Sequence, residues 1–510
     1  MKLSSFATLG SVLGIYFSVS VLAVANPVER DIAGTATVFL DQPSGKPEKL
    51  ASGWIYGFPD NADGTANTDV PQKYIKDVGF NYNRAGGAQT PYKGWARNEY
   101  EVSHFPSLLS WLPLKATGFP LTFNKGRWKS SLSNYRTTRR NGGKFILLIH
   151  DLWGADSTQG KGFPYPGDGG NWKNWNAFLD QVFSDILKNK MTAGLEIDIW
   201  NEPDLNLFWD APQTQYLNMW KRTYERIRKE LPGVQITGPS TTTPPTVDSE
   251  WYNNYLKFIA KTNTIPDFYS WHLLATDRNL RESKAQFDTL RKKYKLPERP
   301  ININEYASWD GEQNPAGAVF YISQFERHNA HGLRANWASQ GQLHDFLANL
   351  LIKNSDGDYS PAGEWHVYQY YNQVMKGNRV ATSPSDDELF EVYATRGGSA
   401  GTVKILAAIR PVAGKKTYNL AITGLSAVKV KGPTVRVSTY RFGGPNVCTA
   451  VGAPVDLGTF KHTIKNDQVS LEDFDSQQLL LAWRFTNILQ IMFFVAADDR
   501  TQAFAFEFEV

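Results

Sequence analysis

Short apolar runs alternate with amphipathic segments along residues 51–378. Between several of these runs lie segments whose apolar residues recur at helical spacing, and one such segment places Trp175, Phe178 and Val182 on a single face. Strands that alternate with helices predict a parallel sheet, and eight of them match the closure of a (β/α)8 TIM barrel better than a doubly wound sheet. The eight runs with the character of buried strands are 52–58, 77–86, 144–152, 194–202, 234–240, 267–274, 301–307 and 333–339.

The stretch 87–140 interrupts this alternation. It contains several prolines and shows neither a helical nor a strand period. We therefore expect an elaborated loop after the second strand that covers part of the barrel mouth.

The pattern changes beyond about residue 380 to short β-type runs separated by Gly, Pro and Asn. This predicts an antiparallel all-β sandwich over 379–486. The run "TATVFLD" within 26–50 has no place in the barrel and is a candidate to join that sandwich. The tail 487–510 fits neither domain, and its apolar run of about nine residues is too short to span a bilayer. A peripheral strand and an erroneous gene end are both open for it.

Residues 1–25 have the pattern of a secretory signal peptide. Lys2 supplies the positive start, an apolar stretch follows, and Ala23-Val24-Ala25 has the small-x-small form of a cleavage site. An uncleaved anchor is the alternative. The pattern predicts a secreted, extracellular protein with no membrane attachment after cleavage.

Charge and cysteine content narrow the class of protein. The formal net charge is +4, and +3 after loss of Lys2, which is too balanced to favour nucleic acid or an anionic membrane as a partner. The chain has one cysteine, Cys448, so an intrachain disulfide is impossible and stability must come from a large core.

Carboxylates stand at the ends of two predicted strands. Asn201-Glu202-Pro203 ends the fourth, and Asn304-Glu305-Tyr306 ends the seventh. Active sites of (β/α)8 barrels lie at the carboxyl ends of the strands. Glycoside hydrolysis needs two carboxylates there, one to protonate the leaving oxygen and one to attack the anomeric carbon or activate water. Each motif alone is weak, but their joint placement favours a catalytic pair.

Two further acids lie within the fourth predicted strand. Glu196 and Asp198 alternate with Ile197 and Ile199, so they share the opposite face. If that face lines the barrel lumen, both acids are buried and must be paired or neutral. We expect structural ion pairs for them.

The segments "LLIHDLWG", "WNEPD" and "INEYA", followed by a predicted β-sandwich, resemble clan A of the glycoside hydrolases. Within that clan of retaining (β/α)8-barrel enzymes, the combination looks most like family 39 and its fungal secreted members. The resemblance covers about residues 50–485. It implies a glycosidase, in a family that includes β-xylosidases, α-L-iduronidases and exopolysaccharide hydrolases.

The resemblance also implies roles for individual residues. Glu202 would be the acid/base and Glu305 the nucleophile. Asn201 would bond the sugar 2-hydroxyl, and Arg84, at the end of the second predicted strand, would hold the nucleophile ionised.

Three more residues are candidates for substrate binding. His272, at the end of the sixth predicted strand, matches a clan position near the nucleophile, and Trp337 matches the aromatic that floors the sugar subsite. His150, at the end of the third, is a candidate on its position alone, although a histidine at a strand end is also often a hydrogen-bonded packing residue.

Other chemistries find little support in the sequence. It has no HExxH, paired cysteines, clustered histidines or phosphate-binding glycine loop, so we expect neither a metal nor a cofactor. Residues 397–401 satisfy G-x-S-x-G, but a strand-like run follows where the serine hydrolase elbow needs a helix.

The leading hypothesis is a secreted retaining glycoside hydrolase that cleaves polysaccharide or oligosaccharide by double displacement. It predicts that the two carboxyl groups stand about 5 to 5.5 Å apart. The alternative is a non-catalytic carbohydrate-binding or cell-wall-associated protein on an inactivated barrel, which the joint presence of Glu202, Glu305, Asn201 and Arg84 disfavours. The sugar, its linkage, exo or endo action and the oligomeric state are left open.

Overall fold

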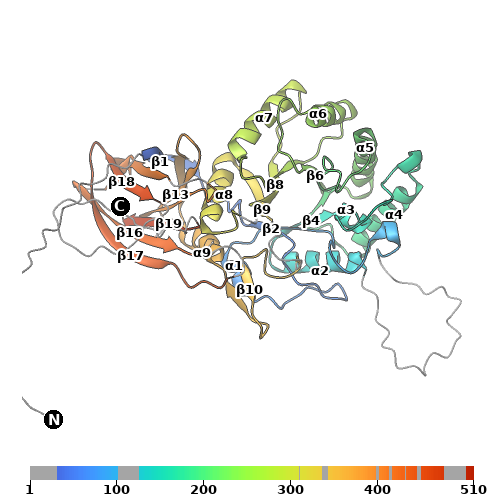
Figure 1. Cartoon of the computed structure of the whole chain (residues 1–510), viewed down its shortest axis with the longest axis horizontal. Helices are drawn as coiled ribbons and strands as arrows, with labels where there is room; N and C mark the ends of the chain where they lie inside the picture. Colours follow the sequence, from blue (N-terminus) through green and yellow to red (C-terminus); the bar gives the residue numbers. More distant parts are fainter. Residues whose placement is uncertain are drawn as a thin grey trace, which may run out of the picture. The chain divides into compact units, whose positions relative to one another are not determined.

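The computed structural model describes residues 32–100, 126–308, 311–335, 343–397, 401–412, 416–430, 432–444, 449–475 and 501–509. Within these residues the predicted architecture is confirmed. Eight parallel strands close into a barrel, and a mostly antiparallel β domain completes the fold (Figure 1). The predicted signal peptide 1–25 and Trp337 lie outside the described residues.

Each barrel strand falls on one of the eight predicted runs. All neighbours pair in parallel, and β2 pairs with β9 to close the ring. The last strand starts three residues earlier than predicted. The strands are β2 (Gly53–Ile55), β3 (Tyr82–Ala85), β4 (Lys144–Leu148), β5 (Leu195–Asp198), β6 (Gln235–Thr241), β7 (Phe268–Leu273), β8 (Ile301–Tyr306) and β9 (Ala330–Arg334).

Helices surround the barrel and bury apolar faces against it (Figure 1). The predicted face of α4 is buried through Trp175, Phe178 and Val182. No helix in the described ranges is long and apolar enough to cross a membrane. The helices are α1 (Gln72–Asp77), α2 (Arg127–Arg140), α3 (Ile149–Trp153), α4 (Lys173–Lys188), α5 (Gln213–Glu230), α6 (Glu250–Thr262), α7 (Leu280–Lys293), α8 (Pro315–His328) and α9 (Gly363–Gln369).

The prediction of an irregular loop over 87–140 is wrong for its last part, which forms α2. This helix buries Trp128 and Leu132, but most of its buried side chains are small hydroxyl and amide groups. Ser131, Asn134 and Thr138 are fully buried there, and Asn83 on β3 donates to Thr138. A search for hydrophobic periodicity cannot detect such a face.

The β domain is a nine-stranded sheet in the order β17-β16-β19-β14-β13-β12-β1-β15-β18. Its pairs are antiparallel except β1 with β15, so the N-terminal run joins this sheet. Side chains from eight of its strands meet in one apolar core. The strands are β1 (Ile32–Gly45), β12 (Asn378–Ser383), β13 (Phe390–Gly397), β14 (Thr402–Ile409), β15 (Thr417–Thr423), β16 (Thr434–Phe442), β17 (Val455–Thr463), β18 (Gln468–Asp475) and β19 (Ala503–Glu509).

The C-terminal residues have a place in this sheet, which corrects the expectation that the tail 487–510 fits neither domain. Strand β19 pairs with β14 on one side and β16 on the other. Its side chains alternate between two cores because successive residues of a strand point to opposite faces. Phe504, Phe506 and Phe508 enter the core of the β domain, whereas Ala503 and Ala505 join the core of the barrel.

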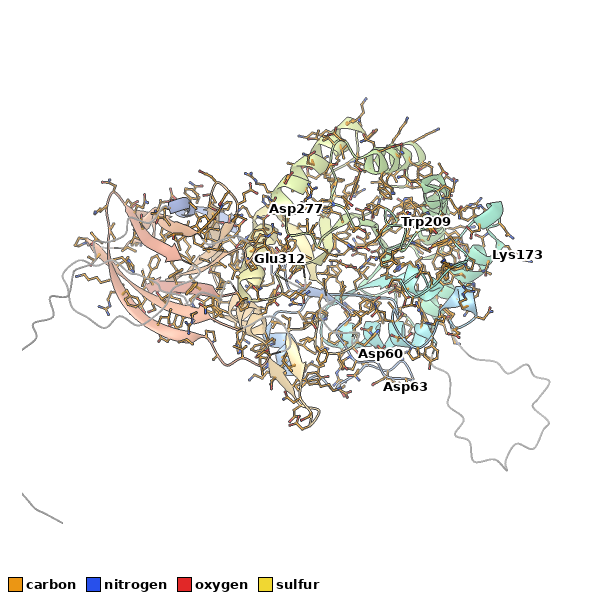
Figure 2. The ribbon with its side chains drawn as sticks, viewed as in Figure 1. Asp60, Asp63, Lys173, Trp209, Asp277 and Glu312 are labelled. Carbon is orange, nitrogen blue, oxygen red and sulfur yellow. The ribbon has the colours of Figure 1, made fainter. Side chains whose placement is uncertain are left out.

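Helix α8 is the element on which the barrel and the β domain meet, since it contacts both β13 and β14. Just before it, Glu312 (labelled in Figure 2) accepts a 2.6 Å bond from Arg410 at the end of β14, with both side chains buried. Within the helix, Arg327 pairs with the buried Glu391 at 2.6 Å. Two ion pairs therefore join the domains, and both side chains of the Arg410–Glu312 pair are buried from water.

We predict that Arg410→Met lowers the free energy of unfolding by about 3 to 5 kcal/mol, because Glu312 is left as a buried charge without its partner. Denaturant titration measures this change. The matched control is Lys221→Met, in a pair whose side chains are 40% and 52% exposed, and we expect a change of about 1 kcal/mol or less there. Equal effects of the two substitutions would contradict a special role for the buried pair.

Candidate active site

The structure brings Glu202 and Glu305 together at the carboxyl ends of the barrel strands. Glu305 lies within β8, and Glu202 lies on the turn after β5. One carboxylate oxygen of each, together with Nδ1 of His272 on β7, lie within 4.8 Å of one another. All three side chains are buried, so the group sits where water is largely excluded.

Arg84 on β3 links most of the predicted site residues. Its Nη1 donates to Oε1 of Glu305 at 2.8 Å, its Nη2 to Oδ1 of Asn201 at 2.6 Å, and its Nε to Oδ2 of Asp198 at 3.0 Å. Burial lowers the pKa of Arg84, but the carboxylates of Asp198 and Glu305 outweigh it and raise that pKa above its usual value. The guanidinium therefore stays charged beside Glu305.

The two acids within β5 differ in their partners. Asp198 forms the expected ion pair with Arg84, and it also accepts bonds from Ser240 at 2.7 Å and from Asn304 at 2.9 Å. Glu196 accepts a bond from the hydroxyl of Tyr82, and burial raises its pKa to about 7. Asp198 thus holds Arg84 in place, whereas among the described residues Glu196 bonds Tyr82 in place of the expected ion pair.

Glu202 occupies an unusual backbone conformation, with φ at +43° in the left-handed region. Its N–H donates to the carbonyl of Ser240 on β6 at 2.8 Å, which holds the turn in place. Burial is the main cause that raises the pKa of Glu202 to about 7, and the charge of Asp204 adds to it against the opposing effects of Arg84 and Thr242. Glu202 therefore keeps its proton to far higher pH than an ordinary glutamate.

His272 lies between the two glutamates. Its Nδ1 is 2.8 Å from Oε1 of Glu202 and 3.7 Å from Oε2 of Glu305. Burial lowers the pKa of His272, although the charge of Glu305 partly opposes this. A neutral imidazole in this place orients Glu202 without adding a positive charge to the site.

His150 is not part of this group. It lies in the short helix α3, where its ring packs against Trp200 and Phe208 with centroid distances of 5.5 and 5.8 Å. Its Nδ1 is 3.0 Å from Asp151. Contact of His150 with substrate stays a prediction, as does the role of Trp337, for which the structure describes no geometry.

Tyr56, which the sequence did not single out, lies with Asp151 beside Arg84, and the two residues follow the first and third barrel strands. The Tyr56 hydroxyl donates to the Asp151 carboxylate, and burial raises the pKa of Asp151 to about 7. Gly86 permits this packing, since a Cβ there would lie 2.1 Å from the carbonyl of Leu148. Their positions toward the ends of the predicted runs 52–58 and 144–152, Asp151 directly after the candidate His150, were the available signal.

Aromatic rings support the turn that carries Glu202. Trp200 and Trp209 meet edge to face with centroids 4.9 Å apart, and Trp209 is labelled in Figure 2. The indole of Trp200 donates to the carbonyl of Phe208 at 3.1 Å. These contacts fix the path of the chain on either side of the glutamate.

The group of Glu202, His272 and Glu305 offers atoms that could ligate a metal ion. The guanidinium of Arg84 already donates to Glu305, and its positive charge opposes a cation in the same place. The arrangement therefore suits proton transfer and nucleophilic attack better than metal binding.

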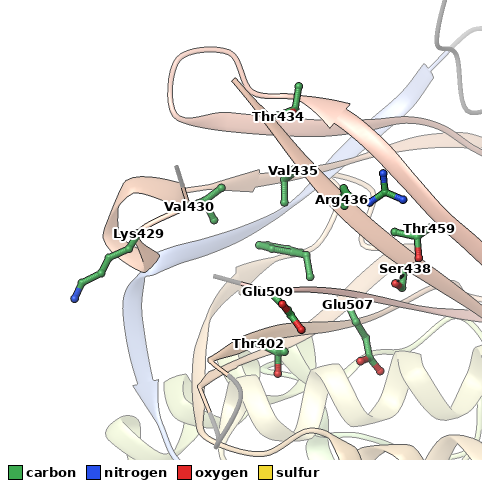
Figure 3. Close-up of a pocket in the computed structure, with 11 residues that line it drawn as sticks. Thr402, Lys429, Val430, Thr434, Val435, Arg436, Ser438, Thr459, Glu507 and Glu509 are labelled. Atoms are coloured by element: carbon green, nitrogen blue, oxygen red, sulfur yellow. Dashed lines mark hydrogen bonds between the residues drawn. The ribbon is translucent and has the colours of Figure 1, made fainter. Parts of the chain in front are cut away.

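A groove of about 520 Å³ lies on the β domain across β14, β16, β17 and β19 (Figure 3). Its lining is mostly hydroxyl and charged side chains, such as Ser438, Thr459, Arg436 and Glu507. Phe508 is its one aromatic among the described residues and is only 3% exposed, so it offers no ring face to a sugar. The groove gives no support for glycan binding by this domain.

Comparison with known proteins places this geometry in context. The model of glycosyl hydrolases family 39 matches residues 170–324, a segment that contains both glutamates. A 3-O-beta-L-arabinopyranosyl-alpha-L-arabinofuranosidase of Bifidobacterium pseudocatenulatum is 26% identical over 227 residues. That match covers 42% of this chain and 20% of the relative, so the chain spans about a fifth of the relative's length.

Solved structures share the whole fold. A protein of Neocallimastix frontalis has a TM-score of 0.64 at 20% identity, covering 93% of this chain and 99% of its own. A monomeric beta-xylosidase of Caulobacter crescentus has a TM-score of 0.54 at 14% identity, covering 94% of this chain and 99% of its own. The barrel and the β domain therefore recur together in other proteins.

We predict that the free energy of unfolding of Glu202→Gln increases relative to that of wild type as pH rises. The folded-state pKa of Glu202, about 7, exceeds the ordinary 4.5, so the stability from its bound proton is complete below pH 4.5 and is lost as pH rises through 7. The neutral Gln has no such loss. The stability difference between variant and wild type should thus grow by about 3 kcal/mol between about pH 4 and pH 8.

Denaturant unfolding at a series of pH values measures this difference. Glu225→Gln, at a side chain that is 52% exposed, is the control and should show a flat difference. A flat profile for Glu202→Gln as well would contradict the raised pKa.

Proposed function

We propose that this chain, whose residues 170–324 match the model of glycosyl hydrolases family 39, is a retaining glycoside hydrolase with Glu305 as nucleophile and Glu202 as acid/base. In the first step the Glu305 carboxylate attacks the anomeric carbon while Glu202 gives its proton to the departing glycosidic oxygen. In the second, Glu202 takes a proton from water, whose oxygen attacks the same carbon and releases Glu305 as a carboxylate.

The opposite environments of the two glutamates carry this proposal. Arg84 places a buried positive charge 2.8 Å from Glu305, which favours the charged form that attacks. Glu202 has a pKa of about 7, which favours the protonated form that an acid needs. Environments that separate the protonation states of two neighbouring carboxyl groups define an acid and a nucleophile.

The short separation of the two carboxylates supports retention of configuration. Oxygens of Glu202 and Glu305 lie within 4.8 Å, whereas inverting enzymes keep their carboxyls about 6.5 to 9.5 Å apart to admit a water. Direct attack by Glu305 fits this spacing.

The same proximity lets Glu202 change from acid to base between the steps. Two negative charges no more than 4.8 Å apart, at an effective dielectric constant of about 20, repel by roughly 3 kcal/mol or more. Once Glu305 is bound covalently to the sugar, its negative charge is gone, and Glu202 can ionise without that repulsion. Its pKa falls when it must accept a proton from water.

Asn201 and His272 complete the proposed site. Arg84 occupies Oδ1 of Asn201, which leaves the Nδ2 amide as the group that can donate to a sugar hydroxyl. His272 bonds Glu202 and holds its carboxyl toward Glu305. Asn201 is held by Arg84 on β3, and His272 is part of β7, so the barrel strands set the positions of both.

Pentosides are the first substrates to examine. The named relatives are an arabinofuranosidase and a beta-xylosidase, and both names refer to five-carbon sugars. We propose aryl arabinofuranosides, aryl xylosides and the corresponding oligosaccharides as the initial panel. The pattern in residues 1–25 further supports action outside the cell, and the N-terminal sequence of protein recovered from the culture medium tests this.

We predict that Glu305→Gln abolishes turnover of every glycoside, because an amide cannot attack the anomeric carbon. Glu202→Gln should reduce kcat about 10²- to 10⁴-fold on an unactivated oligosaccharide and far less on an activated aryl glycoside in the first step, since that leaving group needs no proton. Steady-state and burst kinetics on both substrate types measure these effects. Glu225→Gln is the exposed control and should retain wild-type rates.

We predict that the first-formed sugar has the anomeric configuration of the substrate. Proton NMR spectra taken before mutarotation show the two anomers as separate signals. Initial release of the opposite anomer would overturn the assignment of Glu305 as a nucleophile and would favour activation of water on the opposite face of the sugar.

A further inference from the structure

Asp204 shares the turn after β5 with Glu202 and is tied to the same neighbouring strand. Its carboxylate accepts the N–H groups of Thr242 at 2.9 Å and Thr243 at 3.1 Å, directly after β6. Glu202 itself donates its N–H to Ser240 on β6 at 2.8 Å. Both acids are therefore fixed against one end of one strand, and their mutual distance is set by the backbone.

The other charges near Glu202 are already matched. Arg84 on β3 pairs with Asp198 on β5 and Glu305 on β8, and His272 on β7 is buried with a lowered pKa. By contrast, no lysine, arginine or histidine nitrogen in the described part of the chain lies within 4.0 Å of the Asp204 carboxylate. The two backbone N–H groups give this carboxylate hydrogen bonds but place no opposite charge beside it.

We propose that Asp204 is a positioning residue for the acid/base, which fixes the Glu202 turn against β6 and supplies the negative charge that keeps Glu202 protonated. This inference rests on the proposed role of Glu202. The direction of the electrostatic effect agrees with it, since Asp204 is the second cause, after burial, of the raised pKa of Glu202. An acid that must hold its proton at neutral pH benefits from a nearby negative charge that does not itself contact the substrate.

The test is the pH dependence of kcat/KM for Asp204→Asn on an unactivated glycoside. The amide keeps an oxygen that accepts a backbone N–H but removes the charge, so Glu202 loses its proton more easily. We expect the alkaline limb of the profile to shift to lower pH by about one unit. With an aryl glycoside that needs no acid, the same variant should keep the wild-type limb.

Two further variants separate charge from fold. Asp210→Asn removes a charge from the same turn at an exposed side chain and should leave the limb unchanged. Asp204→Glu keeps the charge while disturbing the two bonds to β6, and should keep the limb near its wild-type position even if kcat falls. An unchanged limb in Asp204→Asn, or an equal shift in Asp210→Asn, would overturn the proposal.

The outcome for Glu202→Gln distinguishes this failure from a failure of the proposed function. If Glu202→Gln abolishes the alkaline limb but Asp204→Asn does not move it, Glu202 is the acid and Asp204 does not tune it. If Glu202→Gln leaves the limb in place, the acid lies elsewhere and both proposals fall.

Discussion

The buried guanidinium of Arg84 is the interaction on which the site depends. A charge with 1% exposure is tolerated inside a protein only when its donors are satisfied and its charge is balanced. Asp198, Asn201 and Glu305 provide both, and each comes from a different part of the barrel wall or its rim. Any change in the curvature of the barrel would separate these partners, so the closure of the sheet and the geometry of the site are one constraint.

The lumen of the barrel around Arg84 is polar. Asp198 and Asn304 point into the lumen, while Ile197 and Ile303 lie on the opposite sides of the same strands and pack in the apolar core. The outer contacts supply the hydrophobic stabilisation, which leaves the inner layer free to hold charge. The β domain contributes from outside, because Arg410 holds Glu312 on the segment that follows β8. The strand that carries Glu305 is thereby supported from outside the barrel as well as from its lumen.

Much of the architecture could be predicted because outward-facing apolar residues mark each barrel strand, and because strand ends identify Glu202, Glu305 and Arg84. Helix α2 was missed because most of its buried side chains are serine, threonine and asparagine, whose burial depends on partners such as Asn83 that a periodicity search does not supply. A peripheral strand was one of two possibilities for the tail, but β19 lies inside the sheet, and its two-sided burial exists only between β14 and β16. His150 lies near the end of the predicted run 144–152, but the chain forms α3 there, which directs its ring to Trp200.

The difference between the two glutamates follows from the path of the chain. Glu305 is part of β8, so its side chain is held in the barrel wall within reach of Arg84. Glu202 lies beyond the end of β5, where a left-handed residue followed by Pro203 turns the chain away and toward β6. That turn leaves Glu202 buried, bonded to His272, and two residues from the Asp204 carboxylate, which accepts two backbone N–H groups. One carboxyl is thus placed beside a cation and the other beside an anion, and the barrel establishes this contrast before any substrate binds.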